Sequence, residues 1–449
     1  MQRDIKICLP EDVKTIIETI ENAGYEAYAV GGCVRDSLLG RTPDDWDITT
    51  SAKPEQVKEL FKRTIDTGIQ HGTVTVMMHH VGYEVTTYRI DGEYEDSRHP
   101  KEVVFTANLV EDLRRRDFTI NAMAYNDRVG IVDEFNGMED LNNKIIRAVG
   151  NPLDRFTEDA LRIMRAVRFS AQLGYEIEDE TRKAIGVLAG NLQNISAERI
   201  QVELVKLVKS SHPEKMRDLY ETGITAVIMP EFDEAMKTEQ HHPHHKYSVG
   251  EHTIHSMEAI EADKNLRLAM LFHDLGKAGC KTTDQEGIDH FHGHAAISEE
   301  LCKKILRRLK FDNDTIHVVS RLVKNHDYEV EPGKKYVRRA INRIGEDVFP
   351  LLLKVKQADM NAQSDYKKEE KQQKFDEIAA LYEEIIKDNE CVSLKTLEVN
   401  GADLIAWGMK PGKDIGEMLA RLLQTVLDDP ALNDKDKLYP YFVKFREEI

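Results

Sequence analysis

Two aspartates near the N-terminus have the type and spacing of metal ligands. The segment Asp44-Asp45-Trp46-Asp47-Ile48 places Asp45 and Asp47 two residues apart. On a strand, residues i and i+2 point to the same face, so both carboxylates would face one site. Carboxylate oxygens bind Mg²⁺, and two such ions can activate an attacking hydroxyl and stabilise a leaving pyrophosphate. Aspartate pairs are also common in acidic loops, so this prediction depends on the residues around them.

A glycine pair stands shortly before these aspartates. Gly31 and Gly32 follow a short apolar run that ends at Val30. Glycines let a backbone approach a phosphate closely, and the N-terminus of the next helix offers free amides. Arg35 follows within one turn and is placed to clamp a triphosphate. Alone, the pair would equally fit a tight turn between a strand and a helix.

Three arginines and an aspartate precede another apolar run in the segment Asp112–Ala122. We expect Arg116 to contact phosphates and Asp117 to hold a sugar or orient the arginine, whereas Arg114 fits a solvated charge run. Glu84, in the middle of a strand-like segment, is a candidate third acidic residue.

Histidines mark a second chemical region, because ten of the seventeen lie between His241 and His294. His273 and Asp274 follow an apolar helical run, Leu266–Phe272. Adjacent imidazole and carboxylate ligands suit Mn, Ni, Fe or Mg when further ligands converge on them. The candidates for those further ligands are His252, His294, His326 and Asp359. We expect His241, His242 and His244 to be surface residues.

The elements that must position these groups indicate an α+β head followed by helical domains. Strand-like runs occur at Tyr28–Val30, Thr73–Met78, Tyr83–Tyr88 and Val103–Thr106, and helical periodicity dominates from Asp154 onward. We predict a head over residues 1–150, a helical neck over 151–238, the histidine-rich module over 239–365 and a helical tail over 366–449. The charged stretch 365–374 fits a solvated helix face.

Composition sets limits on the function. Charged residues make up 32% of the 449 residues and the formal net charge is −18, so any nucleic-acid contact must use locally clustered basic residues. We see no apolar run long enough to span a membrane and no signal peptide. The five cysteines form no CxxC pair, which favours a reducing compartment. We therefore expect a cytoplasmic protein.

Five stretches in order give the sequence a resemblance to a known family. They are GGCVRDSLLG at 31–40, DDWDI at 44–48, RRRDFTINA at 114–122, DEFNGMEDL at 133–141 and TEDALRIMRAVRF at 157–169. The chain resembles the class II CCA-adding enzyme and bacterial poly(A) polymerase family, within the polymerase-β-like nucleotidyltransferases. The resemblance implies a small mixed or antiparallel sheet with helices in the head, followed by all-α neck, HD and tail domains. It also implies Mg²⁺, ATP, CTP and tRNA as cofactor, substrates and partner, with no protein partner evident.

The resemblance assigns roles to residues that match its motifs. Asp45 and Asp47 correspond to the catalytic magnesium ligands. The corresponding nucleotide-binding residues are Gly32, Arg35, Arg116, Asp159, Arg162, Arg165 and Arg168.

Asp159 and Arg162 would together read the incoming base. We expect Thr157 to cap a helix on which Asp159 and Arg162, three residues apart, share a face. Cytosine and adenine each present an amino donor beside a ring-nitrogen acceptor, which an aspartate and an arginine complement. Uracil and guanine would leave buried groups unpaired. Arg168 falls nearly opposite Asp159 and is expected to tie neck to head. An ordinary surface ion pair is the alternative for Asp159 and Arg162.

The segment Arg89–Pro100 carries alternating charge, including Asp96 and Arg98. In the family, a loop here helps to switch from C to A addition, and its presence favours an enzyme that adds the terminal A. A polar hairpin loop is the alternative.

The histidine region is similar to the HD phosphohydrolase superfamily, whose pattern is H…HD…D. The similarity implies that His252, His273, Asp274 and Asp359 bind a divalent metal (Mn, Ni, Co or Fe), with His294 and His326 at a second site or on the substrate phosphate. A degenerate module kept only as structure is the alternative. The tail resembles the region that meets the tRNA elbow in HD-bearing relatives, with Gly412, Gly416 and the lysines around 410–413 as candidate contacts.

These features predict template-independent addition of CMP, CMP and AMP to the tRNA 3′ end, with an attached 2′,3′-cyclic phosphodiesterase or phosphatase for tRNA repair. An A-adding enzyme and a poly(A) polymerase are alternatives within the class. An HD nucleotide phosphohydrolase with an RNA-docking head, or a non-catalytic RNA-binding scaffold, would be alternatives of another class.

Overall fold

The computed structural model describes residues 6–91 and 103–448, and its contacts divide the chain into two compact units, Met1–Pro230 and Glu231–Ile449. The finer division into four domains remains a prediction. We describe each unit by itself.

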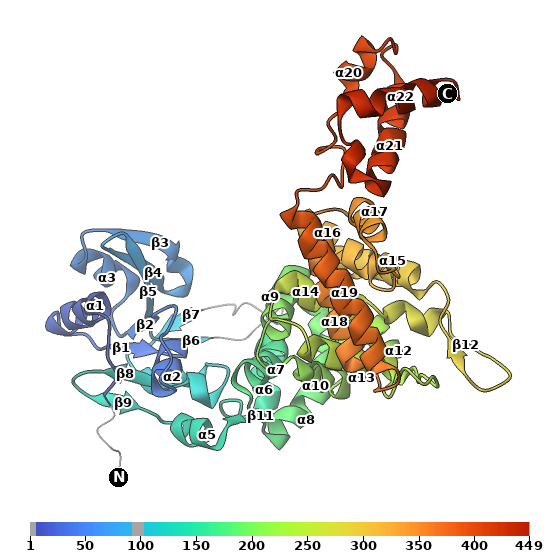
Figure 1. Cartoon of the computed structure of the whole chain (residues 1–449). Coiled ribbons are helices and arrows are strands. Elements are labelled where there is room, and N and C mark those ends of the chain that lie inside the picture. The colour runs from blue at the N-terminus through green and yellow to red at the C-terminus, as the bar shows by residue number, and fades with distance from the viewer. Residues whose placement is uncertain (1–5, 92–102, 449) are drawn as a thin grey trace. The chain divides into compact units, whose positions relative to one another are not determined.

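A mixed seven-stranded sheet organises the first unit (Figure 1). In spatial order its strands are β3 (Thr64–Gly68), β4 (Thr73–Met78), β5 (Val81–Thr87), β2 (Ile48–Thr50), β1 (Ala27–Val30), β8 (Ala124–Asn126) and β9 (Gly130–Val132). β2 and β5 run parallel, with Ile48 opposite Val85, and the other neighbouring pairs are antiparallel. The predicted mixed sheet is confirmed, and three of the four expected strand runs belong to it. The fourth, β7 (Val103–Phe105), pairs instead with β6 (Arg89–Asp91).

Hydrophobic spacing explains how helices cover this sheet. α1 (Glu11–Asn22) buries Val13, Ile16, Ile17 and Ile20, a helical repeat that packs on β1 and β2. Leu109 and Leu113 of α4 join Tyr28 and Val30 in a separate cluster. The other helices of the head are α2 (Gly32–Leu38), α3 (Pro54–Leu60), α4 (Leu109–Arg114) and α5 (Gly137–Asn143).

The neck helices complete the first unit. They are α6 (Pro152–Glu158), α7 (Leu161–Leu173), α8 (Asp179–Leu188), α9 (Ala197–Val208), α10 (Met216–Glu221) and α11 (Ile224–Ile228). α7 packs on α9 and α6 on α8. A short parallel pair, β10 (Ile145–Ile146) with β11 (Glu176–Ile177), joins the end of the head segment to the neck.

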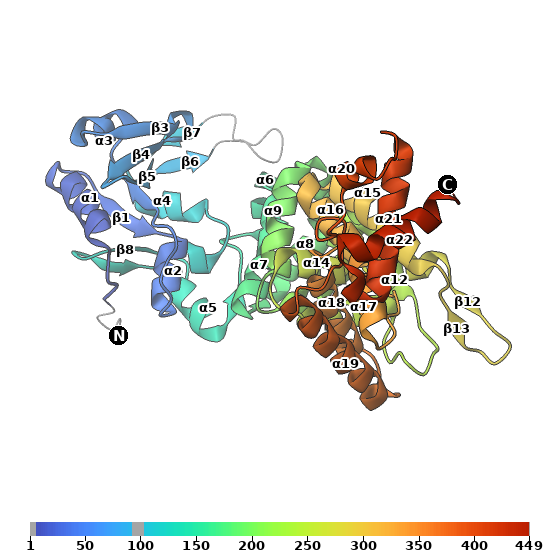
Figure 2. The same cartoon turned by 45° about the horizontal axis from the view of Figure 1, so that its top comes forward.

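The second unit is almost entirely helical (Figures 1 and 2). Its helices are α12 (Pro230–Lys237), α13 (Val249–Glu258), α14 (Lys264–Phe272), α15 (His294–Arg308), α16 (Asn313–Asn325), α17 (Lys334–Ile344), α18 (Phe349–Ala362), α19 (Lys368–Lys387), α20 (Gly401–Ala406), α21 (Lys413–Asp428) and α22 (Lys435–Arg446). A small hairpin of β12 (Thr282–Thr283) and β13 (Asp289–His290) extends from them in both views. The charged stretch 365–374 does begin an exposed helix, α19. Leu404, Met418, Leu422 and Phe442 form a separate core for the last three helices.

Candidate functional site

The glycine pair forms the turn between the buried strand β1 and α2. Gly31 has φ of +83°, a conformation that other residues rarely adopt, and a Cβ there would lie 2.9 Å from Arg116 Nη1. Gly31 therefore has to be glycine, both for its backbone and for the close approach of an arginine. Gly32 begins α2, and Arg35 on the same helix is buried.

Asp45 and Asp47 lie just before the interior strand β2, and not on a strand as expected. β2 begins only at Ile48, so both aspartates belong to the segment that leads into it. Both side chains are exposed, although protein atoms on one side of Asp47 desolvate its carboxyl and raise its pKa. Arg116 lowers that pKa and Asp45 raises it, by smaller amounts. The two carboxylates are close enough to interact, as the sequence predicts for a shared cation.

Glu84 on β5 joins this pair. It stands one residue before Val85, and Val85 lies opposite Ile48 in the parallel register. Desolvation raises the pKa of Glu84, and the charges of Asp47 and Asp45 raise it further. Three exposed carboxylates that repel one another fit the oxygen-ligand chemistry of a divalent cation. Strand pairing between distant segments has no local signature, so residue spacing alone could not place Glu84 beside Asp47.

The arginine-rich motif is held by a residue that the sequence analysis did not single out. Asp112 is fully buried and accepts hydrogen bonds from Arg115 Nε and Nη2 at 2.9 and 2.8 Å and from Thr49 Oγ1 at 3.1 Å. Arg116 Nη2 lies 3.5 Å from the other oxygen of Asp112. Arg116 Nε is buried without a hydrogen-bond partner among the described residues, so Arg116 retains an unused donor. Arg114 is exposed, as expected for a solvated charge.

The neck segment begins differently from the prediction. Thr157 does not cap a helix; instead α6 runs from Pro152, capped by Asn151, and ends at Glu158. Asp159 is extended, and α7 starts at Leu161. The expectation of one continuous helical face was wrong, because the helix breaks where the Asp159 carboxylate accepts a hydrogen bond at 3.0 Å from the amide two residues further on, Leu161 N.

Asp159 and Arg162 make separate contacts in this structure. Arg199 Nη2 donates to Asp159 Oδ2 at 2.9 Å. Arg162 is buried, with Nη1 donating to Glu158 Oε2 at 2.7 Å and Nη2 to the Arg115 carbonyl at 2.8 Å. Arg162 therefore contacts the head through Arg115, whereas Asp159 contacts the neck helix α9 through Arg199.

Arg165, and not Arg168 as expected, makes the contact between neck and head. Arg165 of α7 contacts the head, through Asp117 Oδ2 at 2.7 Å from Nε and 2.6 Å from Nη2. Arg168 was expected to tie neck to head, but its Nε donates to Glu203 Oε2 of α9 at 2.7 Å and its guanidinium stacks on Phe169. Arg168 therefore ties two neck helices together. Burial alone would raise the pKa of Asp117. The charge of Arg165 and the other interactions that favour the carboxylate outweigh burial, so the pKa of Asp117 is lowered.

The segment predicted to switch from C to A addition lies mostly outside the described residues. Of its charged members, Asp96 and Arg98 fall within 92–102. Arg89 lies on β6, where Nη1 contacts the His71 carbonyl.

In the second unit, the HD residues converge around Asp274. His252 Nε2 lies 3.6 Å and His273 Nε2 3.3 Å from Asp274 Oδ2, and His252 Nε2 lies 2.8 Å from Asp359 Oδ1. His252, His273 and Asp274 are buried, and their ligand atoms lie within 4.8 Å of one another. The four residues predicted for the first metal are thus brought together from α13, the end of α14 and α18.

A second group shares Asp274 through its other oxygen. His294 Nε2 and His326 Nε2 lie 3.3 and 3.4 Å from Asp274 Oδ1, and 3.1 Å from each other. His273, His294 and His326 each place Nδ1 within 2.9 Å of a backbone carbonyl. A carbonyl only accepts, so Nδ1 carries the proton and Nε2 keeps its lone pair for a metal. These donors would suit two divalent cations, with Asp274 offering one oxygen to each ligand group.

A cavity of about 310 Å³ opens onto these ligands. Lys277 enters it and approaches Asp274 Oδ2 at 2.7 Å, and its charge, with that of His273, keeps the Asp274 pKa well below normal although burial alone would raise it. His242 and His245 also line the cavity. His241 is exposed as expected, and His242 and His244 are partly exposed at the surface.

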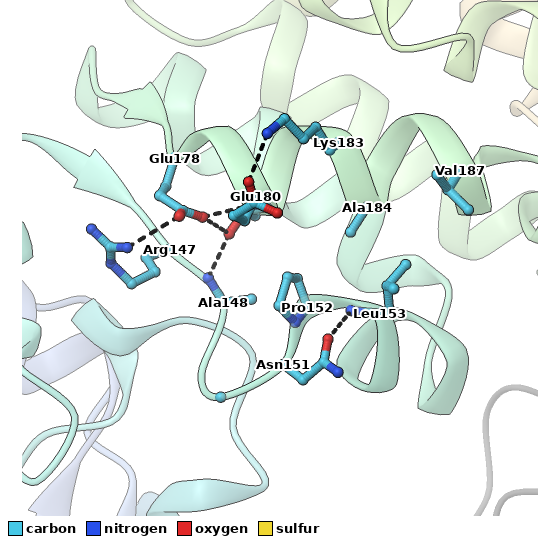
Figure 3. Close-up of a pocket in the computed structure, with 12 residues that line it drawn as sticks. Arg147, Ala148, Asn151, Pro152, Leu153, Glu178, Glu180, Lys183, Ala184 and Val187 are labelled. Carbon is cyan, nitrogen blue, oxygen red and sulfur yellow. Dashed lines mark hydrogen bonds and ion pairs between the residues drawn. The ribbon is translucent and has the colours of Figure 1, made fainter.

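A second cavity, of about 420 Å³, lies between α6 and α8 (Figure 3). Its floor is apolar, with Pro152, Leu153, Ala184 and Val187, and its charged rim is paired internally, as in the 3.2 Å contact between Arg147 and Glu178. This lining lacks converging donors for a phosphate, so we assign it no chemistry.

In the tail, Gly412 and Gly416 are open, with no atom within 4 Å of an added Cβ. Gly416 lies within α21, and the tRNA role of this region remains a prediction.

Three family models match the chain along its length. A model described as "Poly A polymerase head domain" matches residues 27–147, and one described as "Probable RNA and SrmB- binding site of polymerase A" matches residues 174–236. A third, "tRNA nucleotidyltransferase domain 2 putative", matches residues 282–441.

Relatives that match this chain over nearly its whole length show the family to which it belongs. A CCA-adding enzyme of Ligilactobacillus salivarius is 35% identical over 452 residues, 98% of this chain and 98% of that protein. The chain belongs to the CCA-adding enzymes. A relative in this family, from Leuconostoc mesenteroides, is 53% identical over 208 residues, so the matched part spans 46% of this chain and about half, 52%, of the relative. The solved CCA-adding enzyme of Bacillus stearothermophilus in complex with CTP has a TM-score of 0.73 at 30% identity, covering 97% of this chain and 96% of that one.

The predicted family and its polymerase-β-like head are therefore confirmed for this CCA-adding family member. Over residues 6–91 and 103–448, no helix is long and apolar enough to cross a membrane.

Proposed function

We propose that the chain adds CMP, CMP and AMP, from CTP and ATP, to the 3′ end of tRNA. The observation that carries this proposal is the convergence of Asp45, Asp47 and Glu84 beside a glycine turn, the buried Arg35 and the half-buried Arg116. Family membership and a family model named for tRNA nucleotidyltransferase support the same activity. The relative solved with CTP supports the choice of nucleotide.

The carboxylates would hold Mg²⁺ and the arginines would hold the triphosphate. When bound, the ions would make the attacking 3′-hydroxyl more acidic and neutralise the departing pyrophosphate. Asp45 and Asp47 would provide two ligands from the segment that leads into β2, and Glu84 would add a third from β5. Arg116, with its free Nε, is placed to donate to a phosphate oxygen. Gly32 gives the backbone room to approach that phosphate.

Asp159 and Arg162 would act as a protein template for the base. Each already has a partner with the hydrogen-bonding character that a base would offer. Asp159 accepts from a guanidinium donor, and Arg162 donates to a carbonyl oxygen. The amino group and ring nitrogen of cytosine or adenine would replace these partners, whereas uracil or guanine would leave a donor or acceptor unpaired. Arg165 and Arg168 would then support the neck that carries the template.

The direct test offers tRNA transcripts that lack CCA, CA or A to the purified chain, with each nucleotide separately and with CTP and ATP together. A full CCA-adding enzyme lengthens the first transcript by three nucleotides and rejects UTP and GTP. Extension only of the transcript lacking A would establish the A-adding alternative, and long A tracts would establish a poly(A) polymerase.

A second activity is proposed for the HD module, as a metal-dependent phosphohydrolase acting on 2′,3′-cyclic phosphates or nucleotide monoesters. The bridging position of Asp274 between two ligand groups and the cavity above them support it. A 3′ end blocked by phosphate lacks the hydroxyl that nucleotide addition needs, so its removal would serve tRNA repair. Mn, Ni, Co or Fe would suit the imidazole and carboxylate ligands. If this activity alone is found, the head would be an RNA-docking domain.

We place this enzyme in the cytoplasm. Its five cysteines are all free, which fits a reducing compartment.

A further inference from the structure

Asn121 lies buried between two arginines that belong to different parts of the proposed nucleotide site. Its Oδ1 accepts a hydrogen bond from Arg35 Nη1 at 2.6 Å, and its Nδ2 donates to Asp117 Oδ1 at 3.1 Å. The other oxygen of Asp117 accepts from Arg165 on α7. A continuous chain of hydrogen bonds thus runs from the neck helix to the glycine turn.

A second contact joins the same two arginines. Phe169 of α7 has the guanidinium of Arg35 5.1 Å from its ring centroid and that of Arg165 at 5.3 Å. Arg35 is further held by a two-point contact with Asp36, at 2.9 and 2.8 Å. A shift of α7 would therefore be felt at Arg35 both through Phe169 and through Asn121.

The amide of Asn121 is chemically suited to this position. A side chain at this position must accept a hydrogen bond from the Arg35 cation and donate one to the Asp117 anion. An amide has both an acceptor and a donor in one rigid group. A carboxylate here would repel Asp117, and alanine would remove one buried hydrogen bond from Arg35 and one from Asp117 and so break the link between them. The backbone beside it is also fixed, since Gly31 N donates to the Met123 carbonyl at 3.1 Å.

We propose that Asn121 is a positioning residue that couples the base-reading neck to the triphosphate-binding Arg35. This inference rests on the proposed nucleotide addition. A correct base settles α7 in one position, and the chain Arg165–Asp117–Asn121 then aligns Arg35 with the triphosphate. Discrimination against a wrong base consequently acts on the rate of transfer as well as on binding.

The experiment measures kcat and KM for CTP and for UTP, on tRNA lacking CCA, with the parent, Asn121→Ala and Asn121→Asp. Because a 1 Å misplacement can cost about 100-fold in rate, we expect kcat for CTP to fall by about 10- to 100-fold while KM changes by less than about 3-fold. The preference in kcat for CTP over UTP should shrink. Asn126→Ala is the matched control, because Asn126 is a buried head asparagine bonded to the Ala27 carbonyl instead; it should lower the melting temperature and leave the preference unchanged.

A parent that adds no CMP would reject the proposed function before any variant is compared. If the parent is active, equal losses for CTP and UTP in both Asn121 variants, or no loss at all, would overturn the coupling role. Should Asn121→Ala fail to fold, Asn121→Asp keeps the size of the side chain and carries the test. A double variant of Asn121→Ala with Arg165→Ala gives a further criterion: its kcat should lie within about 3-fold of the worse single variant, because residues acting as one unit are not additive. If the kcat losses of the two single variants multiply in the double variant, Asn121 and Arg165 do not act through one connected set of hydrogen bonds.

Discussion

Glu84 lies beside Asp47 across the parallel pairing of β5 and β2, one residue before the opposed Val85 and Ile48. Desolvation is the main cause of the raised pKa of Glu84, and the charges of Asp47 and, more weakly, Asp45 add to it. The two segments are far apart in sequence, and only the sheet brings their carboxylates together. The head therefore presents three acidic groups at this site. Residue spacing alone indicated only two of them, Asp45 and Asp47.

Asp45→Asn and Asp47→Asn should each reduce nucleotide addition by at least about 100-fold, because a ligand that stabilises developing charge is lost. Glu84→Gln should have a smaller effect on kcat and should raise the Mg²⁺ concentration needed for half-maximal rate. tRNA binding, measured by gel shift, should stay nearly intact in all three. Asp66→Asn, at an exposed aspartate of β3, is the control. Normal activity in either aspartate variant would remove the pair from the site.

Asp159→Ala or Arg162→Ala should relax base choice and admit UTP or GTP. A buried group left unpaired costs about 1–3 kcal/mol, so the discrimination ratio should fall by about 10- to 100-fold. Single-nucleotide incorporation with each of the four triphosphates measures the ratio, and Arg114→Ala at an exposed position is the control. Strict rejection of UTP and GTP by both variants would refute the protein template.

Arg168→Ala should act on stability and not on nucleotide affinity. Glu203 is buried, and removing Arg168 leaves its charge with only the 4.0 Å contact to Arg165 Nη1, so the loss should approach the roughly 3–5 kcal/mol of a broken buried ion pair. Denaturant unfolding measures the loss, and the KM for CTP reports on binding. Replacing both partners, as in Arg168→Met with Glu203→Leu, should recover much of the stability. A raised KM with unchanged stability would instead support the nucleotide-binding role that the motif implies.

Deletion of Asp91–Arg98 should leave C addition and remove A addition. The expectation comes from the charge pattern and from the position of the segment between the carboxylates and the Arg116 motif. Product lengths on tRNA lacking CCA and on tRNA lacking A separate the two steps. A deletion variant that completes CCA would contradict a switching role.

Sequence patterns predicted the features that depend on neighbouring residues, such as strands and helices, but not the side-chain contacts between distant segments. The strands predicted at Tyr28–Val30 and Thr73–Met78 and the helical neck followed from periodicity, and the grouping of His252, His273 and Asp274 followed from the HD resemblance. The partners of Arg165 and Arg168 are 48 and 35 residues away, so no local pattern could distinguish which arginine reaches the head. The break at Asp159 was also missed, because its side chain competes for the backbone amide of Leu161, an interaction that helical spacing does not encode.

The last prediction concerns the number of metal ions in the HD module. Asp274 faces His252 and His273 with one oxygen and His294 and His326 with the other, so its loss should affect both groups. The purified parent should hold up to two equivalents of metal in the module, measured by elemental analysis after loading with Mn²⁺. His326→Ala should remove one equivalent and His273→Ala with Asp274→Ala should remove both, and phosphate release from a 2′,3′-cyclic nucleotide should fall with them.

Nucleotide addition should survive each of these changes, because Asp45 and Asp47 belong to the other unit. His255→Ala is a suitable control, since His255 lies on the same helix as His252 but pairs with Glu258. One equivalent in the parent, unchanged by His326→Ala, would confine the metal to the first group and leave His294 and His326 to the substrate. Absence of metal and of hydrolysis under Mn, Ni, Co and Mg would make the module a structural one, with Asp274 serving only to balance the buried imidazoles and Lys277.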